Sequence, residues 1–366
     1  HKVGNRRMGA NAAASFIVPF EAACADDFPR IGGKCASLAR MIAQGVRVPQ
    51  GFAVTTDAYA LHLRSNGLAA TISERLARIV LDDVDDEERL SHEIRDAIVA
   101  QPMPAAVEQS IREAYRRMSP DGQLPVAVRS SATAEDLPDA SFAGQQDTYL
   151  WVVGEDVVVE KVQACWASLF NARAISYRAE NGLGQIDVLM SVGVQKMVNA
   201  SAAGVAMTLD PINGDRTKIV IDSAFGLGEP VVSGEITPDN FVVEKVLLQV
   251  IKQRISEKDF ELVADRAARR TVERVIAPER RTLPSLTNAQ VLAVARLAKS
   301  LERSMGCPQD VEWAIDADLP EDDNLVALQS RPETVWSQKK KQTTAVYETG
   351  IAGVLGTLLA PIQAKR

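Results

Sequence analysis

The chain has 366 residues, of which 46% are hydrophobic, so it is long enough for about two domains with buried cores. Its formal net charge of -7 argues against a nucleic-acid-binding surface, and no apolar run approaches the ~18 residues that a membrane span needs. We therefore expect neither nucleic acid nor a membrane among its partners. Four scattered cysteines without metal-ligand spacing favour a reducing compartment, so we expect a cytoplasmic protein.

Residues 1–19 stand apart from the rest of the sequence. A pair of arginines precedes a short apolar stretch that faintly resembles a signal peptide, but Pro19 and Glu21 interrupt the pattern before a cleavage site. The chain also begins with His1 rather than methionine. We therefore expect residues 1–19 to be a leader or an expression remnant.

Lys34 follows two glycines at the start of a predicted helix that Gly45 ends. Glycines let a backbone approach a ligand closely, helix N-termini favour anions, and the lysine adds a positive charge for a phosphate. The segment is not a P-loop, because Phe28 stands at the first glycine position and Cys35 replaces the Ser or Thr that would meet magnesium. A plain turn with a surface lysine is the alternative interpretation.

Apolar periodicity and turn residues predict the next elements in chain order. A strand over 51–55 precedes a helix that Thr56 or Asp57 is expected to cap, and the acidic run 82–88 is interpreted as a solvated helix face or loop. Residues 163–180 are expected to form one helix. Further elements are expected as strands over 126–129, 188–198, 218–221 and 240–246, and as a helix that Thr287 or Asn288 caps and Gly306 ends.

Arg129 ends the strand predicted over 126–129, and residues 130–133 are interpreted as its turn. A loop of small residues follows. In this loop Gly144 and Thr148 could cover a phosphate with a backbone N–H group and a hydroxyl. The alternative is an ordinary surface loop.

Residues 194–198 form an apolar strand that two polar residues interrupt. The edge of such a strand can present backbone groups to an adenine ring, and Met197 would then lie against the face of the ring. An edge strand without a ligand is the alternative interpretation.

Two short strands, 310–315 and 325–332, are predicted to form a hairpin that carries three polar side chains on one face. Glu312 points away from its apolar neighbours, and Gln329 and Arg331 share a face because they are two residues apart. A carboxylate, an amide oxygen and a guanidinium together suit a magnesium-bound polyphosphate. The alternative is a polar sheet surface with an ordinary ion pair.

Together these segments resemble the N-terminal nucleotide-binding part of the phosphoenolpyruvate synthase and pyruvate phosphate dikinase family. Rifampicin phosphotransferase and phenylphosphate synthase use the same module. The matching stretches follow the family order, and they lie at 31–38, 126–138, 141–145, 194–198, 203–207, 226–229, 308–314 and 329–336.

The resemblance implies an α+β fold of the ATP-grasp type, in which two subdomains sandwich ATP. We expect 20–125 to form an N-terminal subdomain, 126–336 the remaining subdomains, and 337–366 a linker and C-terminal tail. By resemblance, Lys34, Arg129 and Arg331 would bind the triphosphate and act in catalysis, and the loop of Gly144 and Thr148 would cover it. Adenine would contact Gln195 and Met197. Glu312 and Gln329 would bind Mg²⁺.

Family members pass phosphate through a histidine on a swivelling domain, in a Gly-Gly-x-Thr-Ser-His-type segment that these 366 residues lack. We therefore expect a phosphoryl group to pass from Mg-ATP to a phospho-histidine domain or subunit elsewhere, with AMP and phosphate as products. A small-molecule acceptor would be bound on that partner. The favoured interpretation is the ATP-binding subunit of a split enzyme similar to phenylphosphate synthase. The alternatives are an excised domain of a phosphoenolpyruvate synthase or rifampicin phosphotransferase, and a non-catalytic nucleotide-sensing subunit.

Overall fold

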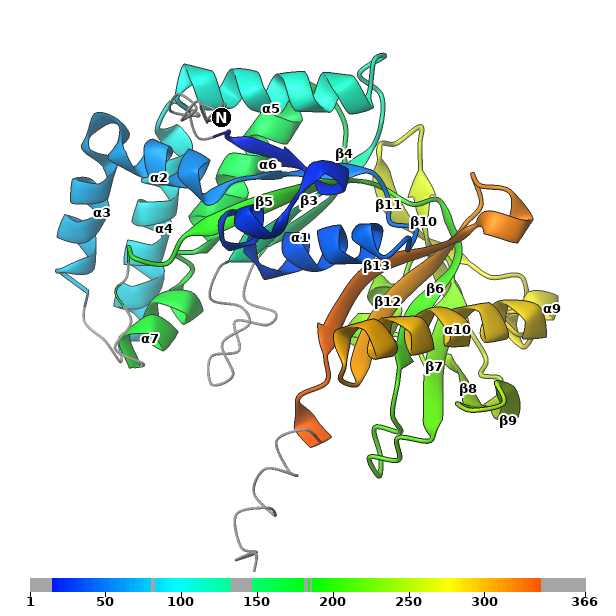
Figure 1. The fold of residues 1–366 in the computed structure, drawn as a ribbon. Helices are drawn as coiled ribbons and strands as arrows, with labels where there is room; N and C mark the ends of the chain where they lie inside the picture. Colours follow the sequence, from blue (N-terminus) through cyan, green and yellow to red (C-terminus); the bar gives the residue numbers. More distant parts are fainter. Residues whose placement is uncertain (1–14, 80–82, 133–146, 181–183, 185, 337–366) are drawn as a thin grey trace, which may run out of the picture.

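The computed structural model describes residues 15–79, 83–132, 147–180, 184 and 186–336, which form two main antiparallel sheets with helices (Figure 1). The α+β class predicted from the sequence is therefore confirmed. Within these residues, no helix has the length and apolar character to cross a membrane. Gly144, predicted to cover a phosphate, lies outside the described residues.

The first sheet, which we name the N-sheet, has its strands in the order β1-β2-β5-β3-β4. Side chains alternate between the faces of a strand, so Val126 and Val128 share the face opposite Arg129. That valine face packs into one core with a layer of helices. The strands are β1 (Ile17–Pro19), β2 (Gly51–Val54), β3 (Val126–Ala132), β4 (Thr148–Val152) and β5 (Met190–Lys196), and the helices are α2 (Thr56–Arg64), α3 (Leu68–Leu76), α4 (Val84–Ala100), α5 (Ala105–Met118), α6 (Glu155–Ser168) and α7 (Ala172–Glu180).

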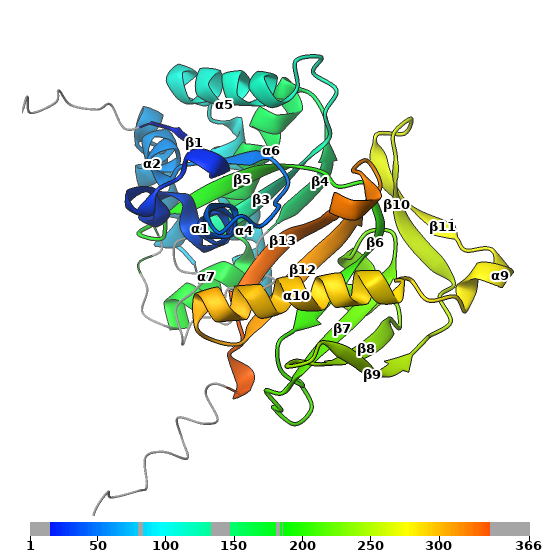
Figure 2. The same cartoon turned by 45° about the vertical axis from the view of Figure 1, so that its right-hand side comes forward.

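The second sheet, the C-sheet, has the order β13-β12-β6-β7-β8-β9, and α10 (Asn288–Met305) lies along one of its faces (Figure 2). The predicted start of α10 is confirmed, because Thr287 and Gln290 form a reciprocal capping box, and the helix ends before Gly306, which has a φ of 72°. The strands are β6 (Ala200–Met207), β7 (Lys218–Phe225), β8 (Asp239–Glu244), β9 (Gln249–Arg254), β12 (Gln309–Asp316) and β13 (Leu325–Pro332).

Helix α1 (Phe28–Ala43) lies between the two sheets and joins them. Its apolar residues Ile31 and Met41 belong to the same core as Trp313 of the C-sheet. The hydroxyl of Ser37 donates a hydrogen bond of 2.6 Å to the backbone oxygen of Ser330 on β13. The two sheets are therefore linked by a helix that contacts both.

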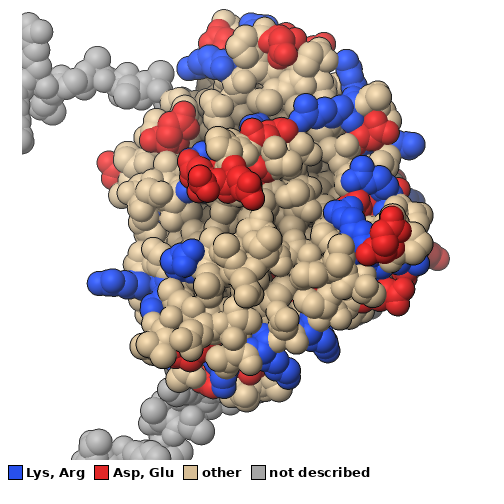
Figure 3. All heavy atoms as spheres, turned by 90° about the vertical axis from the view of Figure 1, so that its right-hand side faces the viewer, with Lys and Arg blue, Asp and Glu red and all other residues tan. Residues whose placement is uncertain are grey.

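A two-stranded hairpin of β10 (Phe260–Asp265) and β11 (Arg270–Val275) stands beside the sheets. The short helix α9 (Pro278–Arg281) follows it in the sequence, and the short helix α8 (Glu229–Ser233) lies between β7 and β8. At its tip, the Arg269 side chain donates a 2.9 Å hydrogen bond to Gln123. Figure 3 shows this side of the molecule, where charged residues of both signs gather mainly around a central area of other residues.

The sheets divide the chain differently from the expected domain limits. Strands β1 and β2 pair in the same sheet as β3, β4 and β5, so the expected boundary between 125 and 126 falls inside the N-sheet. The chain passes from one sheet to the other at residues 197–199, between β5 and β6. Sequence patterns along the chain do not reveal which distant strands become neighbours.

Four local predictions were wrong. Residues 130–132 of the predicted turn are not a turn, because β3 continues to Ala132, and β5 is not an edge strand, because β2 and β3 flank it. The expected single helix 163–180 is two helices, because the Asn171 side chain accepts a hydrogen bond from the Ala174 backbone and starts α7. Helix α2 begins one residue early, with Thr55 as its N-cap.

Candidate functional site

Four of the residues predicted to bind ATP converge on a small cavity between the sheets, which we name the inner pocket. Lys34, Arg129, Gln195 and Gln329 all line it, and they come from α1, β3, β5 and β13. The cavity has a volume of about 20 Å³ in this structure. Residues separated by as much as 295 positions in the sequence are thus brought together by the packing of the two sheets on α1.

Gly32 explains how Lys34 reaches this pocket. Its φ of 71° interrupts α1, and a Cβ at this position would lie 2.1 Å from the backbone oxygen of Ser131. The close approach lets the Ser131 hydroxyl donate to the Ile31 backbone oxygen and accept from the Cys35 backbone N–H. The structure thus uses Gly32 for a close approach to β3, whereas the predicted approach to a ligand stays a prediction; Lys34 Nζ lies 3.2 Å from the backbone oxygen of Ser130.

Arg129 bridges the two sheets. Its Nη2 donates a hydrogen bond of 3.3 Å to the side-chain oxygen of Gln329 on β13. Its Nε is buried and has no hydrogen-bond partner among the described residues. Buried N–H groups are rarely left unpaired in folded proteins, so this guanidinium has spare capacity for an anion.

The predicted hairpin of β12 and β13 is confirmed, and its register brings the expected side chains onto one face. Glu312 lies directly opposite Gln329, and Asp310 lies opposite Arg331. Because Gln329 lines the inner pocket, this polar face is the one turned towards the N-sheet. Val311 and Trp313 lie on the other face, in the core under α10.

Asp310 is a member of this polar face that the sequence reasoning missed. Burial raises the pKa of Asp310, and Arg331 opposes the shift, whereas Glu333 and Glu312 reinforce it. The period of two along a strand could have revealed it, because Asp310 is two residues before Glu312.

The donor set on this face fits a magnesium ion that is shared with a phosphate. Among the described residues, no group of three His, Cys, Asp or Glu side chains could hold a metal by itself. Magnesium in phosphate-binding sites commonly takes one or two carboxylates and fills its remaining positions with phosphate oxygens and water. Glu312 and Gln329, with one carboxylate and one amide oxygen in register, match that requirement.

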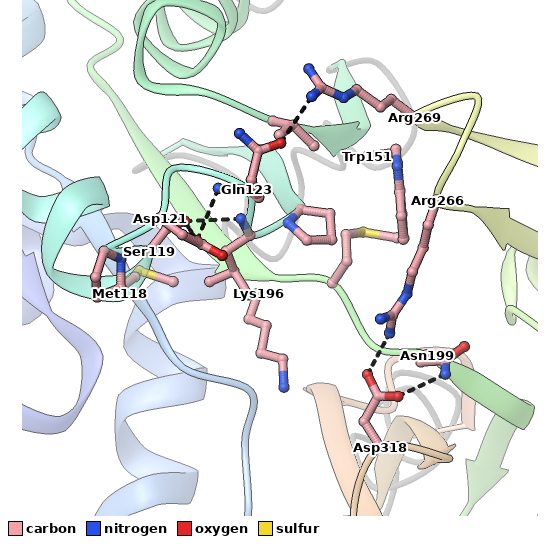
Figure 4. A pocket seen from close by; sticks show the side chains of 15 residues that line it. Met118, Ser119, Asp121, Gln123, Trp151, Lys196, Asn199, Arg266, Arg269 and Asp318 are labelled. Atoms are coloured by element: carbon pink, nitrogen blue, oxygen red, sulfur yellow. Dashed lines mark hydrogen bonds and ion pairs between the residues drawn. The ribbon is translucent and has the colours of Figure 1, made fainter.

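A second and larger cavity, of about 760 Å³, lies at the linker 197–199, and we name it the linker cavity (Figure 4). Met197, predicted to contact adenine, lines it. Met197 also forms a small apolar cluster with Ala127 and Trp151. Polar residues also line the cavity, where Arg266 pairs with Asp318 at 2.9 Å and Asn199 donates to the same carboxylate. The sequence reasoning identified Met197 alone among the lining residues.

Thr148, Glu312 and Arg331 line neither cavity, and Gln195 lines only the inner pocket. Thr148 begins β4 and lies opposite Arg129 in the sheet register. Gln195 has a neighbouring strand on each side, and its side-chain nitrogen donates 3.2 Å to the backbone oxygen of Pro49. The backbone and the side-chain nitrogen of Gln195 therefore bond other parts of the protein, whereas the sequence predicted a strand edge with backbone groups available to a ligand.

Two sheets that face each other across a cationic pocket define an ATP-grasp-like α+β fold. A family model described as the pyruvate phosphate dikinase AMP/ATP-binding domain matches residues 28–350, so the chain belongs to that family.

Among similar proteins, a probable phosphoenolpyruvate synthase of Staphylothermus marinus is 42% identical over 92% of this chain and 43% of its own length. A phosphoenolpyruvate synthase of Aeropyrum pernix is 43% identical over 87% of this chain and 42% of its own length. The chain thus spans less than half the length of these curated relatives. A crystal structure of a D-cycloserine synthetase is 13% identical, covers 74% of each chain and has a TM-score of 0.24, a likeness too slight to carry an argument.

Proposed function

We propose that this chain binds Mg-ATP between its two sheets and positions the triphosphate for transfer of a phosphoryl group to a histidine of another domain or subunit. The observation that carries the proposal is the inner pocket, where Lys34 and the Arg129 guanidinium face Gln329 of the opposite sheet. The unsatisfied Arg129 Nε is the strongest single indication of an anion there.

Each residue of the site has a role in binding or positioning. Lys34 and Arg129 contact phosphate oxygens from the N-sheet side, and Arg331 does so from β13. Arg129 exchanges its contact with the Gln329 oxygen for a phosphate, which frees that oxygen for the metal. Glu312 and Gln329 hold Mg²⁺, which neutralises charge on the phosphates when bound. Thr148, the first residue of β4, covers the triphosphate.

The histidine acceptor belongs to another part of the system in this proposal. His62 is fully buried, its Nε2 lies 3.2 Å from the backbone oxygen of Ile98, and burial lowers its pKa. His92 is exposed on α4, in the helix layer behind the N-sheet. Neither lines the inner pocket. The expected products are AMP and phosphate, and the final small-molecule acceptor binds on the partner.

Two arrangements of that partner are open to experiment. The matched region covers less than half of the length of the relatives. This favours a histidine domain in the same polypeptide, as in a phosphoenolpyruvate synthase or rifampicin phosphotransferase. A split enzyme similar to phenylphosphate synthase is the second candidate. The length of the gene product that reacts with an antibody against this chain distinguishes them.

The first experiment follows β- and γ-labelled ATP with and without the co-purified histidine-bearing partner. Label on a partner histidine together with AMP release supports the proposal. ADP as the only product overturns the dikinase assignment. ATP binding without AMP formation in the presence of the partner would instead identify a nucleotide-sensing subunit.

A further inference from the structure

Trp151 has a backbone conformation that the inner pocket does not explain. Its φ of 57° lies in the left-handed region, which costs a residue with a side chain about 1–2 kcal/mol. Bulky residues rarely adopt it, and such outliers cluster at functional sites. Only 7% of Trp151 is exposed to solvent, yet it lines the linker cavity. The strain therefore lies at a ligand-sized cavity.

A β-bulge produces this conformation. In the pairing of β3 with β4, Val126 lies opposite Val152 and Val128 lies opposite Tyr149. Two residues of β4, Leu150 and Trp151, thus stand against the single residue Ala127. A left-handed residue in such a bulge is usually glycine, and bulges next to active sites re-aim side chains. Here the bulge brings the indole into the cluster with Ala127 and Met197.

This cluster continues the face that forms the inner pocket. Ala127 precedes Arg129 by two residues on β3, so the two share one face, and Ala127 belongs to the cluster with Trp151 and Met197. Two residues along a strand correspond to about 7 Å. An elongated ligand held by Arg129 at one end would therefore reach the Trp151 cluster at its other end.

We propose that the Trp151 indole forms an aromatic wall of the base-binding end of the nucleotide site, inside the linker cavity. The inference rests on the proposed function, in which the inner pocket holds the triphosphate. The cavity volume of about 760 Å³ lies within the range of small-molecule sites. Figure 4 shows Trp151 between Gln123 and Arg266 among the lining side chains.

Stacking defines what Trp151 contributes. Stacking of a base on an aromatic side chain is worth about 1–3 kcal/mol and tolerates any base, because every base has a π-face. Trp151 thus supplies affinity for a base without choosing among bases. Polar groups at the cavity wall, such as Gln123 and Asn199, are left to discriminate between purines.

A purely structural role for Trp151 makes a different prediction. Leu227 and Ala264 pack against its cluster, so a core role would make its removal lower stability without changing ligand preference. The two roles are separated by comparing a ligand that carries a base with one that does not. Mg-ATP and Mg-tripolyphosphate are such a pair, because both place three phosphates in the inner pocket.

The test measures the Kd of both ligands by calorimetry for the wild type, W151L and W151F. Leucine keeps an apolar side chain for the cluster and removes the aromatic face, whereas phenylalanine keeps both. We expect W151L to weaken Mg-ATP binding about 10-fold, which is about 1.4 kcal/mol, and to leave tripolyphosphate unchanged. W151F should stay within a few-fold of the wild type for both ligands.

A second readout does not depend on the stability of W151L. The chain has four tryptophans, and ATP should quench the fluorescence of the wild type and of W336F, but not of W151F. Trp336 is a suitable control because its indole bonds the Pro211 backbone oxygen, outside both cavities.

Three results would count against the inference. The inference is overturned if folded W151L binds ATP as tightly as the wild type. It is also overturned if W151L loses equal affinity for ATP and tripolyphosphate, or if ATP still quenches the fluorescence of W151F. A wild type that binds neither ligand would overturn the proposed function itself, and the two failures are therefore distinguishable.

Discussion

The inner pocket and the linker cavity lie side by side on one face of the N-sheet, but they are built differently. The inner pocket is lined by residues of helices and strands, and the charged and amide side chains among them include Arg129 and Gln329, which are hydrogen-bonded to each other. The linker cavity is lined by loop residues, a bulge residue and the tip of the β10–β11 hairpin. In the proposed function, phosphate recognition therefore uses regular elements, whereas the linker cavity is built largely from irregular ones.

The comparison makes a general prediction about ligands. Changes in the inner pocket should weaken every triphosphate, with or without a base, whereas changes in the linker cavity should affect only ligands that carry a base. The following variants test this division.

The largest effect is expected from Glu312→Ala. Removing the carboxylate opposite Gln329 should lower the apparent Mg²⁺ affinity in ATP turnover with the histidine partner by at least about 100-fold, beyond the loss typical of outer-shell changes. Magnesium titration of AMP release measures this, and circular dichroism should show an intact fold. Glu273→Ala, at an exposed carboxylate of β11, is the matched control and should behave as the wild type. Full turnover by Glu312→Ala would show that Glu312 is not a metal ligand.

Arg129→Ala should weaken Mg-ATP and Mg-tripolyphosphate about equally, by roughly 10- to 100-fold, since hydrogen bonds to charged groups contribute about 1.5–3 kcal/mol. Arg129→Lys should restore only part of the affinity, because lysine lacks the planar fork. Calorimetry with both ligands gives the answer. Arg269→Ala, at the linker cavity, should leave tripolyphosphate binding unchanged. A loss of tripolyphosphate affinity in this variant would contradict the separate roles of the two cavities.

Gly32→Ala tests how the inner pocket is assembled. The new Cβ would meet the Ser131 backbone oxygen at 2.1 Å in a left-handed conformation, so we expect a loss of more than about 1–2 kcal/mol in the free energy of unfolding. Phosphate affinity should fall as well, because Lys34 moves with the helix. Gly45→Ala is the matched control, since Gly45 has a φ of 78° but no atom within 4 Å of its Cβ position. Urea denaturation should show the smaller loss for Gly45→Ala.

Trp151→Gly and Trp151→Ala probe the strain at the linker cavity. Both remove the indole, but glycine adopts the left-handed conformation freely, so the glycine variant should be more stable by about 1 kcal/mol. This order is the reverse of that in ordinary strands. Denaturation curves of the two variants provide the measurement, and a more stable alanine variant would contradict the bulge conformation.

The smallest effect is expected from Asp310→Asn. Burial raises the pKa of Asp310 in the folded state, so stability falls as the pH rises from the unfolded-state pKa to the folded-state pKa and stays reduced above it. Below the pKa of the unfolded chain the carboxyl is protonated in both states, and this loss of stability disappears. Asp310→Asn should therefore raise Tm slightly near pH 7 and leave it unchanged near pH 3. A stabilisation that is equal at both pH values would argue against the raised pKa.

Sequence reasoning succeeded where local physics decides the outcome. The capping box at Thr287, the hairpin of β12 and β13, and the shared face of Glu312 and Gln329 follow from spacing and alternation. It failed where distant pairing decides, as for the central position of β5. The strands β1, β4, β6 and β9–β11 were not predicted as strands, because they are short, their sequences lack clear alternation or their pairing is remote.

The sequence alone thus determined the kinds of groups that serve the site and their order along the chain. Lys34 after its glycines, Arg129 at its strand and the Glu312–Arg331 hairpin are each visible within short windows, because periodicities of 2 and 3.6 residues are local properties. Only the tertiary structure decided that α1 would hold the two sheets together and that a bulge would turn Trp151 towards Met197. Such outcomes depend on packing between segments that are far apart in the sequence, and no local pattern records that packing.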